Sequence, residues 1–213
     1  MQLDSFLKII PKIAKSKLTG TVSHLKMIPP NRKLAFTNEN SLEKPREAAI
    51  ICLFYPDNTG LMHFVLILRK MYEGVHANQI GFPGGKIENT DKNAQDAALR
   101  ELEEEIGVPR EKPTIIKSLS KVYIPPSNFM VYPFLGYLTE KPTFIKDDYE
   151  VAEIIQVALS EHMTSEIQLN TVKTGNASIT VPTFSLNNHI VWGATAMILS
   201  EVKDLLIRTK KLN

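Results

Sequence analysis

Acidic side chains gather in one stretch of the sequence, residues 84–108, which reads GGKIENTDKNAQDAALRELEEEIGV. In an α-helix, at about 100° per residue, Glu101, Glu104 and Glu105 fall within about 100° of arc on one face. Clustered carboxylates repel one another, but they become useful where a divalent cation binds, because Mg²⁺ prefers oxygen ligands. The spacing therefore indicates a candidate metal site, with an ordinary solvated acidic helix as the alternative.

The element predicted to carry these carboxylates is a helix over residues 91–107. Asp91 can cap its start, and Gly107 ends it. Arg100 precedes Glu104 by four residues, so it can pair with that carboxylate and hold it in place. Apolar residues on a different face can anchor the helix to a core: Leu99, Leu102 and Ile106.

A glycine turn stands just before this helix. Phe82, Pro83, Gly84 and Gly85 form an unhindered backbone segment, since glycine has no side chain. Such a turn can bring a backbone carbonyl or amide to a metal–phosphate group. The turn and the acidic helix together favour metal-assisted chemistry on a phosphate over a solvated acidic face.

Strands outnumber helices in the rest of the chain. Apolar runs predict strands over residues 48–55, 61–68, 114–123, 131–138 and 150–159, with a further hairpin over 166–169 and 179–184. Helices are expected over residues 3–17, interrupted at Pro11, and over residues 194–207, with a short turn over residues 159–163. No β-α-β rhythm or internal repeat is visible, so the pattern indicates an α+β fold with a mixed sheet and helices packed on it.

Composition and charge exclude several classes of protein. The chain has 213 residues, 43% hydrophobic and 23% charged, with a net charge of +2. These values are typical of a soluble globular protein, and we expect residues 1–46 to form an N-terminal helix and irregular arm packed on a domain of residues 47–213. The charge is too small for a dedicated nucleic-acid binder, and no apolar run approaches the ~20 residues of a membrane span. The single cysteine, Cys52, can form no intrachain disulfide, which is typical of a cytoplasmic protein.

The acidic stretch resembles the Nudix box, in which a Gly and a spaced acid precede Arg-Glu-(aliphatic)-X-Glu-Glu-X-Gly-(aliphatic). The second half of the box matches at every defined position: Arg100, Glu101, Leu102, Glu104, Glu105, Gly107 and Val108. In the first half, counting from Gly85 places the early acid at Asp91, and Arg100 then arrives one residue late. The resemblance implies a Nudix fold, with a mixed β-sheet sandwiched between α-helices, and a hydrolase in which water attacks a phosphorus atom.

The resemblance also implies roles for individual residues. Glu101 and Glu105 are expected to bind Mg²⁺ or Mn²⁺, Glu104 to assist as a ligand or through water, and the carbonyl of Gly85 to add a further ligand. Arg100 completes the expected catalytic set by bracing the carboxylates. The general base stays open between Glu101 and four acids beyond the box: Asp147, Asp148, Glu150 and Glu153.

The segment before the box, RKMYEGVHANQIGFPGGK, is partly similar to the extra motif of coenzyme A pyrophosphatases, a Nudix subgroup. Arg69 and the Phe-Pro-Gly-Gly run agree with that motif, whereas its second Arg falls on Gly74 and its Gly on Asn78. We expect the substrate to contact Arg69, Lys70, His76, Gln79, Phe82 and Gly84. Tyr123 and Phe129 could stack on an adenine, whereas Trp192 is expected to pack in the core.

The implied function is hydrolysis of the diphosphate bond of coenzyme A or its derivatives, dependent on a divalent metal. The products would be 4′-phosphopantetheine and adenosine 3′,5′-bisphosphate. One alternative is a Nudix hydrolase of ADP-ribose or another nucleoside-diphosphate derivative. A second is a non-catalytic nucleotide-sensing module, against which the intact glutamates argue. The expected partner is a small-molecule nucleotide, with no nucleic acid and no membrane, and a homodimer is left open.

Overall fold

A mixed β-sheet lies at the centre of the computed structural model, which describes residues 1–28, 44–70, 79–174 and 177–211. Its strands are β1 Arg46–Pro56, β2 Met62–Arg69, β3 Ile80–Gly81, β4 Gly84–Lys86, β5 Thr114–Ser118, β6 Val122–Ile124, β7 Phe129–Tyr137 and β8 Val151–Ala158. The order is β3-β2-β1-β7-β5, while β4 pairs with β1, β6 with β7 and β8 with β2. β1 and β7 run parallel, and the other pairs in this sheet are antiparallel.

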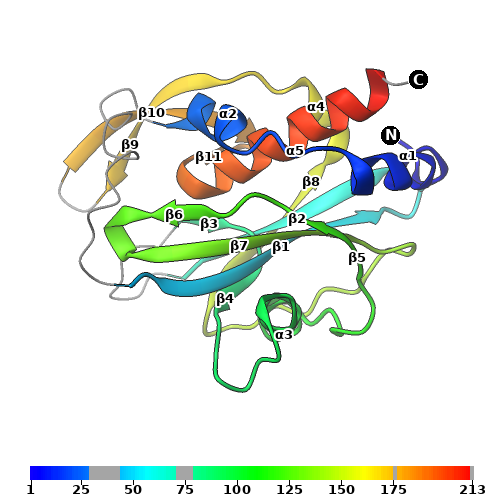
Figure 1. Cartoon of the computed structure of the whole chain (residues 1–213), viewed down its shortest axis with the longest axis horizontal. Helices are drawn as coiled ribbons and strands as arrows, with labels where there is room; N and C mark the ends of the chain where they lie inside the picture. Colours follow the sequence, from blue (N-terminus) through cyan, green and yellow to red (C-terminus); the bar gives the residue numbers. More distant parts are fainter. Residues whose placement is uncertain (29–43, 71–78, 175–176, 212–213) are drawn as a thin grey trace.

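Helices cover both faces of this sheet (Figure 1). α3 (Ala94–Ile106) lies on one face, and α1 (Leu3–Lys15) and α5 (Gly193–Lys211) lie on the other. Because side chains alternate along a strand, β1 buries Ile51 and Leu53 toward α3, and Cys52 and Phe54 toward α1 and α5. A strand that is buried on both faces needs a continuous apolar run, and this explains why residues 48–55 are apolar without alternation. The predicted α+β fold, a mixed sheet between helices, is confirmed.

Most of the predicted strands are present. β1 and β2 form the expected antiparallel pair, with Phe54 opposite Phe64. The expected late hairpin is β9 (Gln168–Thr174) with β10 (Ala177–Leu186), and an unpredicted strand, β11 (His189–Val191), extends it to a three-stranded sheet. The segment expected as one strand over residues 114–123 forms two, β5 and β6. Pro133 of β7, which has no N–H to continue a ladder, lies at the break and accepts from Leu119 N at 2.8 Å.

α1 passes through Pro11 without interruption, so the predicted break is wrong. Proline inside a helix removes one hydrogen bond and costs about 3 kcal/mol or more. Phe6, Ile9 and Ile13 lie on both sides of the proline and are buried against the core, each burial contributing roughly 1.5–3 kcal/mol. The helix continues because its buried face spans the proline, which is itself exposed.

Two further local predictions are wrong. The expected turn over residues 159–163 is a helix, α4 (Leu159–Thr164), which buries Leu159 and His162. α3 begins at Ala94 and not at Asp91, because the side chain of Asn93 caps it by accepting from the N–H of Asp96 at 3.0 Å. At the other end, Gly107 ends α3 in the left-handed conformation, as predicted.

The N-terminal segment packs on α5 through α2 (Thr21–His24) and the 3-10 turn Leu25–Met27. Glu201 of α5, fully buried, accepts from Gly20 N at 2.9 Å and from Ser120 Oγ at 2.6 Å, and lies 3.3 Å from His24 Nε2. This cluster fixes the segment that follows α1 against the last helix. Within the described ranges, no helix is long and apolar enough to span a membrane.

Candidate active site

Three carboxylates converge where α3 meets the sheet. Oxygen atoms of Glu101 and Glu105, both on α3, and of Glu150, just before β8, lie within 4.8 Å of one another. Glu105 is buried, Glu101 is half-buried and Glu150 is exposed. The structure leaves Glu104 outside this group, with its side chain 54% exposed and its Oε2 2.8 Å from Arg100 Nη1. Two of the three glutamates expected at the metal site are therefore joined by an acid from a distant loop.

Glu105 carries a charge that its burial opposes. Burial raises its pKa from 4.5 to about 7, while Arg69 and the backbone N–H of Gly84 act in the opposite direction. Arg69 Nη1 lies 3.0 Å from Glu105 Oε1, and Gly84 N donates to Oε2 at 2.8 Å. Despite the ion pair, Oε1 accepts no hydrogen bond from the residues that the structure describes. A buried carboxylate oxygen without a donor fits a further positive group, such as a metal ion.

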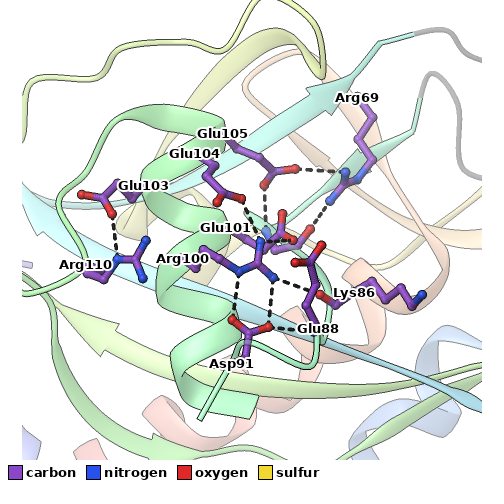
Figure 2. Close-up of polar contacts among 11 residues, drawn as sticks. Arg69, Lys86, Glu88, Asp91, Arg100, Glu101, Glu103, Glu104, Glu105 and Arg110 are labelled. Atoms are coloured by element: carbon purple, nitrogen blue, oxygen red, sulfur yellow. Dashed lines mark hydrogen bonds and ion pairs between the residues drawn. The ribbon is translucent and has the colours of Figure 1, made fainter. Parts of the chain in front are cut away.

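Arg100 links the acidic side chains on the outer part of the helix (Figure 2). Its guanidinium donates to Asp91 Oδ1 at 2.9 Å, to Glu101 Oε1 at 2.9 Å and to Glu104 Oε2 at 2.8 Å. It also donates to the carbonyl of Lys86 at 3.1 Å, which fixes the end of β4. The Arg100 contact lowers the pKa of Asp91, while burial raises the pKa of Glu101 against the opposing effect of Arg100. Asp91, one candidate for the helix cap, therefore acts as the anchor of this arginine.

The glycine turn brings backbone atoms against the carboxylates. Gly84 has φ of +147°, and a Cβ there would lie only 2.6 Å from Ile50 Cα. A Cβ on Gly85 would collide with the carboxylate of Glu101. The turn is held in register because β4 pairs with β1, with Ala49 opposite Gly85. Glycine at both positions permits this close approach, so the turn and the helix form one cradle.

The four acids considered as general bases have different surroundings. Glu150 alone joins the carboxylate cluster. Asp147 accepts from Tyr149 N and Glu150 N, each at 2.8 Å, and so shapes the loop that carries Glu150. Asp148 pairs with Lys146, and Glu153 lies 3.4 Å from His189 Nε2. A bulge in the pairing of β2 with β8, next to Arg69, accompanies the entry of Glu150 into the site.

A cleft of about 580 Å³ opens from the carboxylates. Its polar end is lined by Arg69, Gly85, Arg100, Glu101 and Glu150. Much of the remaining lining is an apolar wall, formed by Met27, Ile28, Ile124, Pro125, Pro126, Phe129, Ile179, Trp192, Met197 and Ile198. Trp192, expected in the core, is half-buried at this wall, because Gly193 turns the chain there with φ of +65° into α5. Tyr123 and Phe129 also line the cleft, as a stacking role would require.

The residues expected to contact substrate fall into three groups. Arg69, Gln79, Phe82 and Gly84 line the cleft, although the guanidinium of Arg69 faces Glu105 and the carbonyl of Gly84. Lys70 lies apart and donates to the carbonyl of Asp148. His76 lies outside the described residues. Sequence reasoning missed the placement of Trp192, and it did not separate Glu150 from its neighbouring acids, because both depend on contacts between distant segments.

The fold and the site together define a class of enzyme. A cradle of carboxylates and glycine backbone beside a cleft suits hydrolysis of a phosphoric anhydride, where charge on the phosphate oxygens must be neutralised. In this chain the cradle is formed by α3, by β4 and by the residue that precedes β8.

Comparisons with known proteins identify the family. The NUDIX domain pattern matches residues 44–174. The protein described as "Uncharacterized Nudix hydrolase NudL" of Photorhabdus laumondii is 28% identical over 179 residues, covering 84% of this chain and 90% of that protein. Its namesake in Escherichia coli K12 is 29% identical over 167 residues, covering 78% and 84%. The chain therefore belongs to the Nudix family and is a Nudix pyrophosphohydrolase.

Solved structures show the same fold. The Nudix hydrolase RenU of M. smegmatis has a TM-score of 0.53 at 16% identity, covering 77% of this chain and 87% of that one. A mutT/nudix family protein from Listeria innocua has a TM-score of 0.52 at 17% identity, covering 80% of this chain and 100% of that one. These identities are low, so the likeness concerns the arrangement of the sheet and helices.

Proposed function

We propose that this Nudix enzyme hydrolyses the diphosphate bond of coenzyme A or one of its derivatives, giving 4′-phosphopantetheine and adenosine 3′,5′-bisphosphate. The observation that carries the proposal is the two-sided cleft, which joins the carboxylate cluster to a broad apolar wall. A coenzyme A molecule has the matching parts: a charged diphosphate at its middle and a long, mostly neutral pantetheine arm.

Mg²⁺ or Mn²⁺ fits the carboxylate cluster. Glu101 and Glu105 would hold the ion with Glu150 beside them, and Gly85, which packs against Glu101, would add its carbonyl as a further oxygen ligand. Glu104 would act from outside through water, since it is exposed and held by Arg100. When bound, the ion neutralises diphosphate oxygens and lowers the pKa of water. The unsatisfied Oε1 of Glu105 and the close carboxylates are the observations that support this assignment.

The chain's own residues would then direct the reaction. Water attacks one phosphorus, the bridging P–O bond breaks, and the bridging oxygen leaves on the other phosphate. Glu150 would take the proton from that water, and its support is its exposed position in the carboxylate cluster. Arg100 holds Glu101 and Glu104 in fixed orientations, and Arg69 does the same for Glu105. Gly84 and Gly85 let the turn lie against β1 and the Glu101 carboxylate, where a Cβ would collide.

The apolar wall favours coenzyme A over ADP-ribose. The second arm of ADP-ribose is a sugar with several hydroxyl groups, and each hydroxyl buried without a partner costs roughly 1–3 kcal/mol. The wall offers chiefly Met, Ile and Pro side chains to such groups. The pantetheine arm presents methyl and methylene groups to the same surface, and its burial is favourable.

A substrate panel tests this proposal. The values of kcat/KM would be measured with Mg²⁺ and with Mn²⁺ for coenzyme A, an acyl-coenzyme A, dephospho-coenzyme A, ADP-ribose and NADH. We expect coenzyme A or its thioester to give the highest value. If ADP-ribose is the best substrate, the assignment to coenzyme A is wrong. If no compound of the panel is cut, the role of the cleft as a hydrolytic site is wrong as well.

A further inference from the structure

One cation next to the lining of the cleft is held by an aromatic ring and a backbone carbonyl, with no acidic partner in the described part of the chain. Arg46, the first residue of β1, places its Cζ 4.2 Å from the centre of the Phe129 ring. Its Nη2 donates to the carbonyl of Ser127 at 2.8 Å. Among the described residues, no carboxylate pairs with it. An arginine has five N–H donors, so most of its donors stay available to a ligand.

The register of the sheet turns this arginine toward the cleft. Side chains two residues apart on a strand share a face, and Ala48 and Ile50 of β1 both line the cleft. Arg46 is the next residue outward in that row. On the neighbouring strand, Phe129 is the direct partner of Arg46, and it also lines the cleft. Arg46 therefore stands at the outer end of a cleft-facing row.

The position of Arg46 relative to the diphosphate site can be read from the pairing of β1 with β4. Gly85, which lies against Glu101, is opposite Ala49. Arg46 is three residues further along β1, or about 10 Å at about 3.3 Å per residue. This distance is too long for Arg46 to contact the diphosphate directly. An anionic group separated from the diphosphate by one ribose ring would lie within reach of the Arg46 side chain.

The two cations expected before the box are engaged elsewhere in the site. The guanidinium of Arg69 is held by Glu105 and by the carbonyl of Gly84, and Lys70 is directed to the carbonyl of Asp148, in the loop that carries Glu150. We propose that Arg46, stacked on Phe129, binds a second phosphate of the substrate, the 3′-phosphate of its adenosine. The inference rests on the proposed function for the identity of the substrate, and it names the residue that selects it.

Binding of non-hydrolysable fragments tests the inference apart from turnover. Adenosine 3′,5′-bisphosphate, its 2′,5′ isomer and AMP contain no diphosphate bond, so calorimetry can be performed on the Mg²⁺-loaded protein. A charge-assisted contact corresponds to roughly 10- to 150-fold in affinity. We expect wild type to bind the 3′,5′-bisphosphate more tightly than AMP by a factor in this range, and more tightly than the 2′,5′ isomer. Arg46→Gln should bring the first ratio close to one, and Arg46→Lys should keep part of it.

Lys121→Gln is the matched control. Lys121 Nζ lies 4.4 Å from the centre of the Tyr132 ring, so it is also a cation over an aromatic ring. Tyr132 follows Val131, which lines the cleft, and therefore faces the other side of the sheet. This variant should leave the affinity ratio unchanged.

Kinetics provide a second reading of the same contact. Arg46→Gln should raise KM for coenzyme A about 10-fold or more with kcat preserved, and leave dephospho-coenzyme A unaffected. A merely structural Arg46 would instead change both substrates equally. The inference is overturned if wild type shows no preference for the 3′,5′-bisphosphate, or if Arg46→Gln weakens it and AMP alike. If coenzyme A is not cut but the Arg46-dependent preference is present, the proposed function fails and the phosphate subsite stands.

Discussion

Replacing Glu105 with Gln is the sharpest perturbation of the carboxylate cluster. Burial raises the pKa of Glu105 from 4.5 to about 7, so the folded state binds this proton more tightly than the unfolded chain. The resulting stabilisation is present below pH 4.5 and is lost as the pH rises through 7. At about 1.4 kcal/mol per pH unit, the carboxylate costs the metal-free protein about 3 kcal/mol at pH 8.

Glu105→Gln keeps the shape of the side chain and removes this cost. The gain is partly offset, because Arg69 loses its partner while its own side chain is only 20% exposed. We expect the metal-free variant to be more stable than wild type by about 1–3 kcal/mol at pH 8, with the difference closing toward pH 5. Urea unfolding in a metal chelator, at several pH values between these limits, measures the effect.

The matched control is Glu103→Gln on the same helix, whose side chain is 38% exposed and pairs with Arg110 at the surface. It should change the free energy of unfolding by less than about 1 kcal/mol. The reasoning is refuted if Glu105→Gln is no more stable than wild type at pH 8, or if the difference does not vary with pH. Turnover with saturating Mg²⁺ should also fall at least about 100-fold, since even the outer contacts of metal ligands are worth about 10- to 100-fold.

Three further changes probe other parts of the structure. Arg100→Lys should raise the Mg²⁺ concentration for half-maximal activity about 10-fold or more. One ammonium group cannot replace the forked contacts of the guanidinium to Asp91 and Glu101. A metal titration with an unchanged midpoint would contradict this. Gly85→Ala should lower kcat strongly, since the added Cβ collides with the carboxylate of Glu101, and steady-state kinetics at wild-type level would show that the cradle is not needed. Burial lowers the pKa of His162 from 6.5 to about 4, so the unfolded chain binds the proton of this histidine more tightly than the folded state does. The stability that comes from burying the neutral imidazole is therefore present above pH 6.5 and is lost as the pH falls toward 4. His162→Leu should flatten this acid-side loss in unfolding curves, and an equally steep loss in the variant would count against the assignment.

The central strands and the acidic helix could be predicted from local pattern. Continuous apolar runs are typical of strands buried on both faces, and β1 and β2 carry such runs. The helix over residues 94–106 follows from its apolar face and from Gly107 at its end. Its start was predicted at the wrong residue because Asp91 and Asn93 are both suitable caps. In the structure Asn93 caps the helix, and Asp91 pairs with Arg100.

The site could be predicted only in part, because its members come from distant segments. Glu101 and Glu105 share a helix face by spacing alone. Glu150 joins them through the pairing of β2 with β8, which no local pattern reveals. The resemblance to the coenzyme A pyrophosphatase motif assigned Arg69 to the substrate, whereas its guanidinium lies against the buried Glu105. Trp192 lines the cleft beside Met27, Ile124 and Ile179, which come from distant segments of the chain, so its place could not be predicted locally.

Product identification in ¹⁸O-labelled water tests the central claim most directly. Wild-type protein and the Glu105→Gln variant would be incubated with coenzyme A and Mg²⁺, and the products would be analysed by mass spectrometry. We expect equal amounts of 4′-phosphopantetheine and adenosine 3′,5′-bisphosphate from wild type, with one ¹⁸O atom in the phosphate of one product, and almost no product from the variant. Intact coenzyme A after prolonged incubation with wild type, products that retain the diphosphate, or equal turnover by Glu105→Gln would contradict hydrolysis of this bond at the carboxylate cluster.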